Sequence, residues 1–279
     1  MAARESERFR STGFPVYPLS VTLSVVIITY NEEANIGRTL ASVKPLVANG
    51  AGEIIVVDSG SSDRTVEIAQ SFGAKVFVEP WKGFAAQKNS AIDKATGDWI
   101  LSLDADEELE PSLALEIPTA IAGAGPGISG FWIRRKNEFL GRWIKHGGFW
   151  PDPKLRLFRR GAGRFEDRAV HEDVGLKGGN TGELTGALLH HSYPTMSDYL
   201  EHMNRYSTLG AEMVVAKGPV RFTVVNLTVR PVATFIYNYF FRLGFLDGRE
   251  GFLLHAHHSV YVGWKYAKAW ELSRTRRQA

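Results

Sequence analysis

Four carboxylates that follow one apolar run are the first candidates for chemistry. The segment ILSLDADEEL, residues 100–109, ends with Asp104, Asp106, Glu107 and Glu108 within five positions. An Asp-x-Asp pair directly after a buried strand has a rigid backbone, and hard cations such as Mg²⁺ or Mn²⁺ take carboxylate oxygens and share them with substrate phosphates. The pair therefore indicates a metal site for a phosphorylated ligand. The plain alternative is a solvated turn that caps the following helix.

Alternating strands and helices must position these carboxylates. Apolar runs predict strands within 23–33, 53–65, 74–80 and 98–106, and helical patterns lie between them over Ala34 to Val47, 65–73 and 84–97. This alternation predicts parallel βαβ units with helices on both faces of the sheet. Ligands of such sheets bind outside the carboxyl ends of the strands, where the polar clusters at 29–33, 58–63 and 104–106 stand.

The pattern changes after about residue 125. Segments 130–141 and 154–161 predict strands that are antiparallel or mixed, and a helical period begins at Thr195. We expect a catalytic domain over 22–215 and an amphipathic, basic C-terminal extension over 216–279.

Composition sets the outer limits. The chain has 279 residues, 44% of them hydrophobic, which supports a substantial core. It has no cysteine, so a metal would be bound by oxygen or imidazole. We expect a cytoplasmic location, because no apolar run approaches the roughly 18 residues of a membrane span and the start lacks a signal-like hydrophobic centre. Ten Lys/Arg and three Asp/Glu lie from Lys217 to the end, so this tail has a net charge of +7. The whole chain has a net charge of +3, so residues 1–216 carry about −4.

Three segments together carry a resemblance to a known family. SVVIITYNEEANIGRTLASV, EIIVVDSGSSDRTVEIA and GFAAQKNSAIDKATGDWILSLDADE resemble the family 2 (GT-A fold) glycosyltransferases, and more closely the bacterial branch that adds glucose to the inner core of lipopolysaccharide. The resemblance covers residues 22 to 205 and implies an α/β GT-A fold: a Rossmann-like, mainly parallel sheet flanked by helices, with a helical, basic, aromatic C-terminal extension. The first strand has neither a Walker loop nor a Gly-x-Gly-x-x-Gly turn, which argues against a P-loop NTPase and a standard dinucleotide-binding fold.

The resemblance implies a nucleotide-binding role for two turns and one helix start. Tyr30 and Glu32 match the motif that lines the nucleotide pocket, and Asp58 matches the acid that accepts hydrogen bonds from uracil or ribose. Gln87 and Lys88 match a polar turn near the nucleotide. The alternatives are helix caps for the turns and a solvated helix face for Lys88. The adjoining matched positions are Asn31, Ser59, Gly60, Asp63 and Asn89.

The family places its metal at the Asp-x-Asp pair. Asp106 is the expected direct ligand of Mg²⁺ or Mn²⁺, and Asp104 is expected to reach the ribose or the sugar. In LLHHSYPT, His191 is expected by motif position, rather than His190, to reach the metal or the diphosphate. Imidazole is an acceptable ligand for Mn²⁺ and a less usual one for Mg²⁺. Packing is the alternative role of these histidines.

The stretch GGFWPDPKLRLFRR matches the part of the family that shapes the donor and acceptor cleft. Trp150 is a candidate to stack on a sugar face, with ordinary burial as the alternative. Arg156 and, equally, Arg159 are candidates to hold phosphates, because guanidinium pairs bidentately with them. As strand residues they are equally expected to be solvated.

Inverting glycosyl transfer needs a general base that removes the proton of the acceptor hydroxyl. In RAVHEDV, Glu172 and Asp173 are the candidates, and the His-Glu pattern of the lipopolysaccharide glucosyltransferases favours Glu172 over Asp173. The preceding His171 is expected either to orient the carboxylate or to pack.

The tail combines an apolar stripe with basic and aromatic residues. Helical spacing relates Leu253, Ala256, Val260, Trp264, Ala267 and Trp270. Packing against the catalytic domain would explain this stripe, but the basic residues beside it favour an interfacial helix on an anionic membrane surface. Nucleic acid is not an expected partner, because the whole chain carries only +3 and has no recognisable binding motif.

These observations predict a metal-dependent, inverting hexosyltransferase. The favoured donor is UDP-glucose, the acceptor is a lipid-linked saccharide such as the lipopolysaccharide inner core, and the location is the inner face of the cytoplasmic membrane. A polyprenyl-phosphate sugar synthase, whose acceptor needs no base, is a second hypothesis. A non-catalytic nucleotide-sugar-binding protein is a third. The donor sugar, the acceptor, the linkage position and the oligomeric state stay open.

Overall fold

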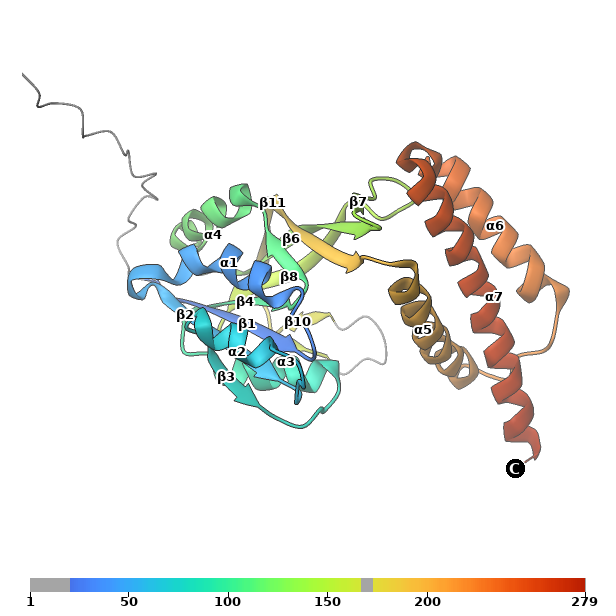
Figure 1. Ribbon diagram of the computed structural model, residues 1–279, viewed down its shortest axis with the longest axis horizontal. Helices are drawn as coiled ribbons and strands as arrows, with labels where there is room; N and C mark the ends of the chain where they lie inside the picture. The colour runs from blue at the N-terminus through green and yellow to red at the C-terminus, as the bar shows by residue number, and fades with distance from the viewer. Residues whose placement is uncertain (1–20, 167–172, 279) are drawn as a thin grey trace, which may run out of the picture.

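A large curled sheet organises the computed structural model, which describes residues 21–166 and 173–278. Within these residues the sheet has nine strands in the order β3-β2-β1-β4-β8-β6-β11-β5, with β7 paired to β6, and β9 and β10 form a separate hairpin (Figure 1). The strands are β1 Leu23–Thr29, β2 Gly52–Asp58, β3 Lys75–Val78, β4 Trp99–Asp104, β5 Glu107–Leu109, β6 Ile128–Phe139, β7 Arg142–Trp143, β8 Asp152–Arg159, β9 Gly163–Phe165, β10 Val174–Leu176 and β11 Asn180–Tyr193.

The first half of the chain forms the predicted parallel βαβ units. Strand β1 pairs in parallel with β2 and β4, and β2 pairs in parallel with β3. All seven residues of β1 are buried, as expected for a strand covered on both faces. The helices of this half are α1 Ile36–Val47, α2 Thr65–Ser71, α3 Phe84–Asp93 and α4 Pro111–Gly123.

Helices cover the two faces of the sheet with separate cores. Alternate strand residues point to opposite faces, so Val25 and Ile27 pack with α1 and α4, whereas Val26 and Ile28 pack with α3. This alternation fixes the register of β1, because a shift of one residue would exchange the two sets of side chains. The α/β fold class is confirmed.

Antiparallel strands enter the sheet after β4, as predicted for 130–141 and 154–161. Strand β8 is antiparallel to both β4 and β6, and β11 is parallel to β6. The short strand β5, which carries part of the acidic run, is antiparallel to β11. This arrangement brings the end of β11 beside the end of β4, although Asp104 and Tyr193, the last residues of these strands, are 89 positions apart in the sequence.

The C-terminal helices form a unit beside this end of the sheet (Figure 1). They are α5 Met196–Ala216, α6 Arg230–Ile236 between the π-helical turns η2 Val225–Val229 and η3 Tyr237–Phe241, the 3-10 turn η4 Gly244–Asp247, and α7 Gly248–Gln278. A capping box between Thr195 and Asp198 starts α5 at the expected residue. None of the helices in the described ranges is long and apolar enough to cross a membrane.

Helix α5 joins the sheet to the C-terminal unit. Its Tyr199 and Met203 pack with Phe139 of β6 and Leu254 of α7. Further along, Ala211 and Val215 of α5 pack with Ala269 of α7. By these contacts α5 belongs to both units, and the boundary between residues 215 and 216 stays a prediction.

A buried carboxylate makes a second connection to the C-terminal unit. Asp247 of η4 is 2% exposed and accepts hydrogen bonds from the backbone nitrogens of Lys145 and His146, at 3.2 and 2.8 Å. Its Oδ1 also lies 3.0 Å from Nδ1 of His146. The C-terminal helices are therefore fixed to the loop between β7 and β8.

Candidate active site

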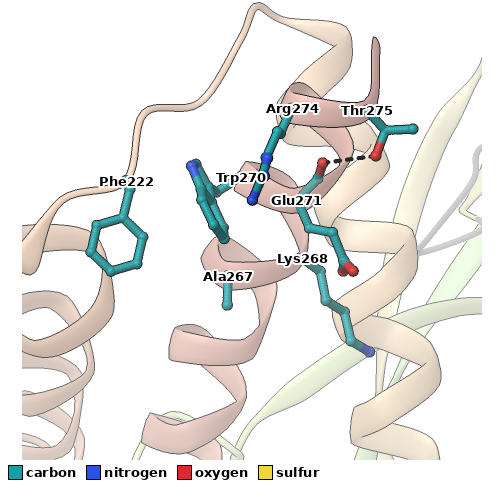
Figure 2. Close-up of a pocket in the computed structure, with 7 residues that line it drawn as sticks. All are labelled: Phe222, Ala267, Lys268, Trp270, Glu271, Arg274 and Thr275. Atoms are coloured by element: carbon teal, nitrogen blue, oxygen red, sulfur yellow. Dashed lines mark hydrogen bonds between the residues drawn. The ribbon is translucent and has the colours of Figure 1, made fainter. Parts of the chain in front are cut away.

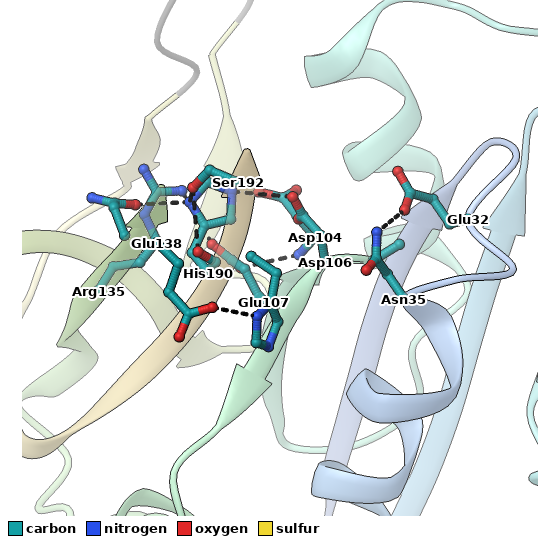
Figure 3. Close-up of polar contacts among 12 residues, drawn as sticks. Glu32, Asn35, Asp104, Asp106, Glu107, Arg135, Glu138, His190 and Ser192 are labelled. Carbon is teal, nitrogen blue, oxygen red and sulfur yellow. Dashed lines mark hydrogen bonds and ion pairs between the residues drawn. The ribbon is translucent and has the colours of Figure 1, made fainter. Parts of the chain in front are cut away.

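The polar ends of β1, β2 and β4 meet at one edge of the sheet. Thr29 is in register with Asp58, and Ile28 is in register with Asp104. The predicted clusters that follow these strands therefore lie together. Figure 3 shows Asp104 and Asp106 beside His190, with Glu32 across from them on the turn before α1.

Asp104 is held by two cations. Its Oδ1 lies 2.7 Å from Nζ of Lys88, and its Oδ2 lies 2.6 Å from a guanidinium nitrogen of Arg156. Burial by itself would raise the pKa of Asp104, but the charges of Arg156 and Lys88 hold it well below its ordinary value. Asp104 is thus ionised and already paired, and its oxygens are positioned by residues of α3 and β8.

Glu107 extends this network into the sheet. It is fully buried, and its Oε1 lies 2.7 Å from Arg156 and 3.2 Å from Arg135. Arg135 also binds Asp152 at 2.7 Å, where its charge helps hold the pKa of that carboxyl at about 2 against the effect of burial. Each arginine therefore bridges two carboxylates, and buried charges of both signs are compensated.

Asp106 has a different environment from Asp104. Burial would raise the pKa of Asp106, but the charge and hydrogen bond of His190 lower it below the ordinary value. The Nε2 of His190 lies 3.2 Å from Oδ2 of Asp106. The other ring nitrogen, Nδ1, lies 2.8 Å from Asn137 and 2.7 Å from Ser192, which fixes the ring and leaves Nε2 directed at Asp106.

The structure brings His190, and not His191, to Asp106. Adjacent residues of a strand point to opposite faces of the sheet. His191 therefore lies on the other face of β11, with Nδ1 2.7 Å from Glu138 and Nε2 3.2 Å from Glu108. The motif position favoured His191, whereas the structure places His190 beside Asp106; a metal-binding role for either histidine stays a prediction.

Glu32 adds a further negative charge opposite the Asp-x-Asp pair. Burial raises its pKa, a side-chain hydrogen bond from Asn35 opposes that rise, and the charges of Asp106, Asp63 and Asp104 add to it. A raised pKa means that the ionised form of Glu32 is disfavoured. Burial is the main cause of this raised pKa, and the negative charges of the three aspartates add to it.

The turns after β1 and β2 hold each other. Asn31 adopts a left-handed conformation, with φ 53°, which asparagine tolerates, and its side-chain oxygen accepts a hydrogen bond from the backbone of Ser62 at 2.9 Å. The carboxylate of Asp63 accepts hydrogen bonds from the backbones of Glu33 and Thr65. Neither α1 nor α2 has a side-chain cap, so Asn31 and Asp63 are not the helix caps named above as the alternative; they connect and shape the two turns.

Asp58 is buried within its own turn. One oxygen accepts from the backbone nitrogens of Gly60 and Ser61, both at 2.8 Å, and the other accepts from the hydroxyl of Ser61. Tyr30, at the end of β1, is 59% exposed. The structure places both residues at the expected edge, with Asp58 engaged by the chain and Tyr30 open to a ligand.

Helix α3 presents polar side chains to the same edge. Lys88 is buried and its Nζ also lies 5.1 Å from the ring of Phe165. The neighbouring Gln87 is buried, and its side-chain amide has no hydrogen-bond partner in the part of the chain that the structure describes. An unpaired buried amide is costly unless a ligand or water satisfies it. Asn89 instead hydrogen-bonds the backbone of Phe165 at 2.9 and 3.0 Å.

The two candidate arginines of β8 have separate roles. Arg156 lies in the network described above, whereas Arg159 is in register with Trp99 at the start of β4 and donates to the backbone oxygens of Ala124 and Ile128. Arg159 therefore belongs to the opposite edge of the sheet. Trp150 is half-buried and packs edge-to-face on Trp143, with ring centroids 5.2 Å apart.

The favoured base, Glu172, and its neighbour His171 lie outside the described residues. Asp173 is described, is exposed, and its backbone oxygen accepts from Glu166 at 3.2 Å, which closes the β9–β10 hairpin. Asn89 fastens this hairpin to α3, one residue from Lys88.

Comparison with known proteins now decides the family. Residues 24–176, which contain the strand ends described above, match the family model for glycosyl transferase family 2. The chain belongs to glycosyl transferase family 2. It is 32% identical over 260 residues to the lipopolysaccharide core biosynthesis glycosyltransferase LpsC of Rhizobium meliloti, which covers 89% of this chain and 92% of that protein. It is also 33% identical over 241 residues to an uncharacterised glycosyltransferase of Rickettsia typhi, covering 83% and 80% of the two chains.

A solved structure agrees with the fold of this family 2 glycosyltransferase. The mannosyltransferase PcManGT of Pyrobaculum calidifontis, in complex with GDP-Man and Mn²⁺, superposes with a TM-score of 0.55. The match covers 91% of each chain at 15% sequence identity, so it shows a common fold. The predicted GT-A fold and family are both confirmed.

Three residues of α5 also line this edge of the family 2 chain, and sequence analysis missed them. His202 stacks on Tyr206 with ring centroids 4.0 Å apart, and it packs edge-to-face on Tyr193 at the end of β11. The guanidinium of Arg205 lies 5.9 Å from the ring of Phe84, the first residue of α3. Burial lowers the pKa of His202 to about 4, with smaller contributions from Arg205 and His190. His202 is therefore neutral near pH 7.

The signal that could have found these residues was weak. The sequence NRYS falls inside a helix that begins at a recognisable cap, and its polar residues alone do not separate a solvated face from a wall of a site. Only the placement of α5 beside α3 and β11 distinguishes the two.

A hollow of about 510 Å³ lies elsewhere, between Phe222 and the end of α7 (Figure 2). Trp270 and Arg274 line it, and neither belongs to the cluster around Asp106. It is a feature of the C-terminal unit.

Proposed function

We propose that the protein is an inverting, metal-dependent hexosyltransferase that moves glucose from UDP-glucose to a lipid-linked saccharide, such as the inner core of lipopolysaccharide. The observation that carries the proposal is the pairing of Asp106 with His190 beside Asp104, at the edge where β1, β2 and β4 end. The printed name of LpsC, a relative across most of this chain, supports the acceptor class.

The residues at this edge fit a divalent cation that keeps part of its coordination shell for the donor. Asp106 supplies an ionised carboxylate, and Nε2 of His190 lies 3.2 Å from its Oδ2, so a cation at this position could take one carboxylate oxygen and one imidazole nitrogen. Within residues 21–166 and 173–278 no group of three or more acidic or histidine side chains is arranged to hold an ion alone. Donor phosphates and water would complete the shell, which is the usual arrangement for Mg²⁺ and Mn²⁺. When bound, the ion would neutralise charge on the departing diphosphate.

The neighbouring residues have separable tasks. Asp104, fixed by Lys88 and Arg156, presents oxygens that accept hydrogen bonds from ribose or sugar hydroxyls. Tyr30 is exposed for stacking on the nucleoside, and the unpaired amide of Gln87 has both a donor and an acceptor to offer.

Arg205 is a further candidate to bind the diphosphate. Lys88, Arg135 and Arg156 are each engaged with carboxylates, so they add little net positive charge. Arg205 has no acidic partner among the residues that the structure describes. From α5, its guanidinium reaches the ring of Phe84, the first residue of α3. A free guanidinium at this position suits an anionic donor.

Glu172 is the proposed general base, with Asp173 as the alternative. A base opposite the leaving group removes the acceptor proton as the new bond forms, and the product is β-linked if the donor is α-linked. Asn89 of α3 holds Phe165 of β9, and Phe165 pairs with Val174, the residue after Asp173; this contact supports a place for Asp173 near the donor. For this reaction we propose peripheral attachment at the inner face of the cytoplasmic membrane.

A donor screen tests the function. Purified protein is incubated with UDP-hexoses and membrane lipids, with Mn²⁺ or with EDTA. We expect transfer of glucose that EDTA abolishes. Glu172→Gln should lower transfer strongly and Asp173→Asn should not; equal activity of Glu172→Gln and wild type would favour the polyprenyl-phosphate acceptor. UDP binding without transfer to any acceptor would favour the non-catalytic hypothesis.

A further inference from the structure

The helix that spans residues 224–241, made of η2, α6 and η3, has an apolar face that no other described part of the chain buries. Val225, Val229, Val232, Ile236 and Phe240 recur at intervals of three or four residues and are between 42% and 54% exposed. No residue of η2, α6 or η3 is buried. The helix therefore contacts α7 along one side and leaves this apolar face, formed by the five residues named above, open to solvent.

Exposed apolar residues continue beyond this helix. Phe241, Leu243, Phe245, Leu246 and Phe252 are all exposed, and Phe241 reaches 76%. Val260 and Trp264 of α7, which belong to the stripe predicted from sequence, are exposed as well. A water-soluble helix normally turns its apolar residues toward a core. A contiguous apolar surface of this kind marks an interaction site.

The segment that carries the apolar face contains charges of one sign only. Between residues 217 and 246 the sequence contains four Lys or Arg and no Asp or Glu. Arg230 stacks on Tyr266 and donates to its hydroxyl at 3.0 Å, and Arg242 lies 5.5 Å from the ring of Tyr237. Neither arginine has a carboxylate partner among the described residues, so both charges are available to an anion.

Basic and aromatic side chains also lie near the C-terminal end of α7, together with the acidic Glu271 (Figure 2). Phe222 precedes the 224–241 helix and packs edge-to-face on Trp270 at 5.2 Å, and the guanidinium of Arg274 lies 6.0 Å from that tryptophan ring. Tryptophan and phenylalanine beside arginine are suited to the boundary between lipid headgroups and acyl chains.

We propose that the apolar face of helix 224–241 is a docking surface for an anionic lipid bilayer, with its side chains inserted at the headgroup level and Arg221, Arg230 and Arg242 on lipid phosphates. A second copy of this chain fits less well. A two-fold contact places the same patch against itself, and this patch would set Arg221, Arg230 and Arg242 against their own copies, while the segment 217–246 contains no acidic residue to pair with them. The negative surface potential of a bilayer instead favours each basic residue.

The proposal deepens the proposed function and rests on it for the acceptor, because a lipid-linked saccharide would be presented at the same surface. Asp247 and α5 fix this helical unit to the loop and strand that border the cluster around Asp106. Docking would therefore hold the donor site at a constant position relative to the membrane.

Vesicle cosedimentation of the full chain, without any sugar donor, tests the proposal. Wild type should bind phosphatidylcholine vesicles that contain phosphatidylglycerol, bind pure phosphatidylcholine much less, and lose binding at high salt. The double variant Ile236→Glu, Phe240→Glu should lower binding at least about tenfold. The matched control Leu115→Glu, Ala122→Glu changes two exposed apolar residues of α4 and should bind the vesicles like wild type.

A charge variant gives a second, independent readout. Arg221→Gln, Arg230→Gln keeps the apolar face and should lower binding to the anionic vesicles by about tenfold. Failure of wild type to bind anionic vesicles, or undiminished binding by the Glu double variant, would overturn the proposal. A dimer in light scattering that the Glu variant dissociates, without vesicle binding, would assign the face to a second copy. UDP affinity of all variants should stay unchanged, so failure here is distinct from failure of the donor site.

Discussion

At the scale of single residues, the account depends on the pair Asp106 and His190. Removing the imidazole with His190→Gln takes away one of two protein ligands of the proposed cation. We expect hexose transfer at saturating donor to fall by about 100-fold or more, with a raised requirement for Mn²⁺. Steady-state transfer assays over a range of Mn²⁺ concentrations measure both effects.

The adjacent histidine is the matched control. His191 faces Glu108 and Glu138 on the other side of β11, so His191→Gln should leave the requirement for Mn²⁺ unchanged. If His191→Gln alters that requirement and His190→Gln does not, the assignment by face is wrong.

Arg205 is predicted to act on donor binding. Arg205→Ala removes the guanidinium without a carboxylate partner in the described chain, so the KM for the UDP-sugar should rise by about tenfold or more, and kcat should change less. Arg205→Lys should recover part of the loss. Arg160→Ala, an arginine at the opposite edge of the sheet that donates to Gly97, should behave like wild type. An unchanged KM in Arg205→Ala would remove this residue from the donor site.

At the scale of elements, Asp247 is predicted to fix the C-terminal helices to the loop after β7. Asp247→Ala leaves the backbone nitrogens of Lys145 and His146 without their acceptor and should lower the free energy of unfolding by about 2 kcal/mol. Glu212→Ala, at an exposed site of α5, should change it by less than about 0.5 kcal/mol. Urea unfolding measures both, and equal stability of the two variants would contradict the connection.

Helix α7 should make folding sensitive to acid. Burial, then His255 and Lys265, lower the pKa of His258 to about 4. Between pH 6.5 and 4 the unfolded chain binds a proton at this position that the folded chain does not, so stability is fully present above about pH 6.5 and falls as the pH decreases.

The variant His258→Phe removes the imidazole that binds this proton. Its loss of stability from pH 7 to pH 5 should be smaller than that of wild type by about 2 kcal/mol, measured by urea unfolding at the two pH values. The same decrease in both proteins would show that His258 titrates normally.

Sequence predicted the elements that local patterns determine. The first four strands, their helices and the cap at Thr195 follow from hydrophobic period and turn residues, and they place Asp104 and Asp106 correctly at a strand end. The family motifs also gave Lys88 and Arg156, which the structure brings to Asp104.

Features that depend on long-range packing were beyond sequence. The choice between His190 and His191 depends on the register of β11 with β5 and β6, and Arg205 is placed by the packing of α5. The stripe on α7 was recognised, but its residues are not the buried ones: Leu254, His255 and Ala269 face inward, while Val260 and Trp264 are exposed. A helical period alone cannot distinguish a core-facing stripe from one that faces a membrane.

In the whole molecule, two separate surfaces would carry the proposed function. The cluster around Asp106 would bind the nucleotide sugar, and the apolar face of helix 224–241 would bind the membrane that carries the acceptor. Helix α5 and Asp247 connect these surfaces through packed, buried contacts. Both proposals therefore describe one enzyme that meets a soluble donor and a lipid-linked acceptor.

The most direct test of the central claim is calorimetric titration of UDP into the purified protein, with saturating Mn²⁺ and with EDTA. The account predicts that Mn²⁺ tightens UDP binding at least about tenfold, equivalent to about 1.4 kcal/mol, and that Asp106→Asn abolishes this difference. Equal UDP affinity in Mn²⁺ and in EDTA, or a full effect of Mn²⁺ on Asp106→Asn, would contradict it.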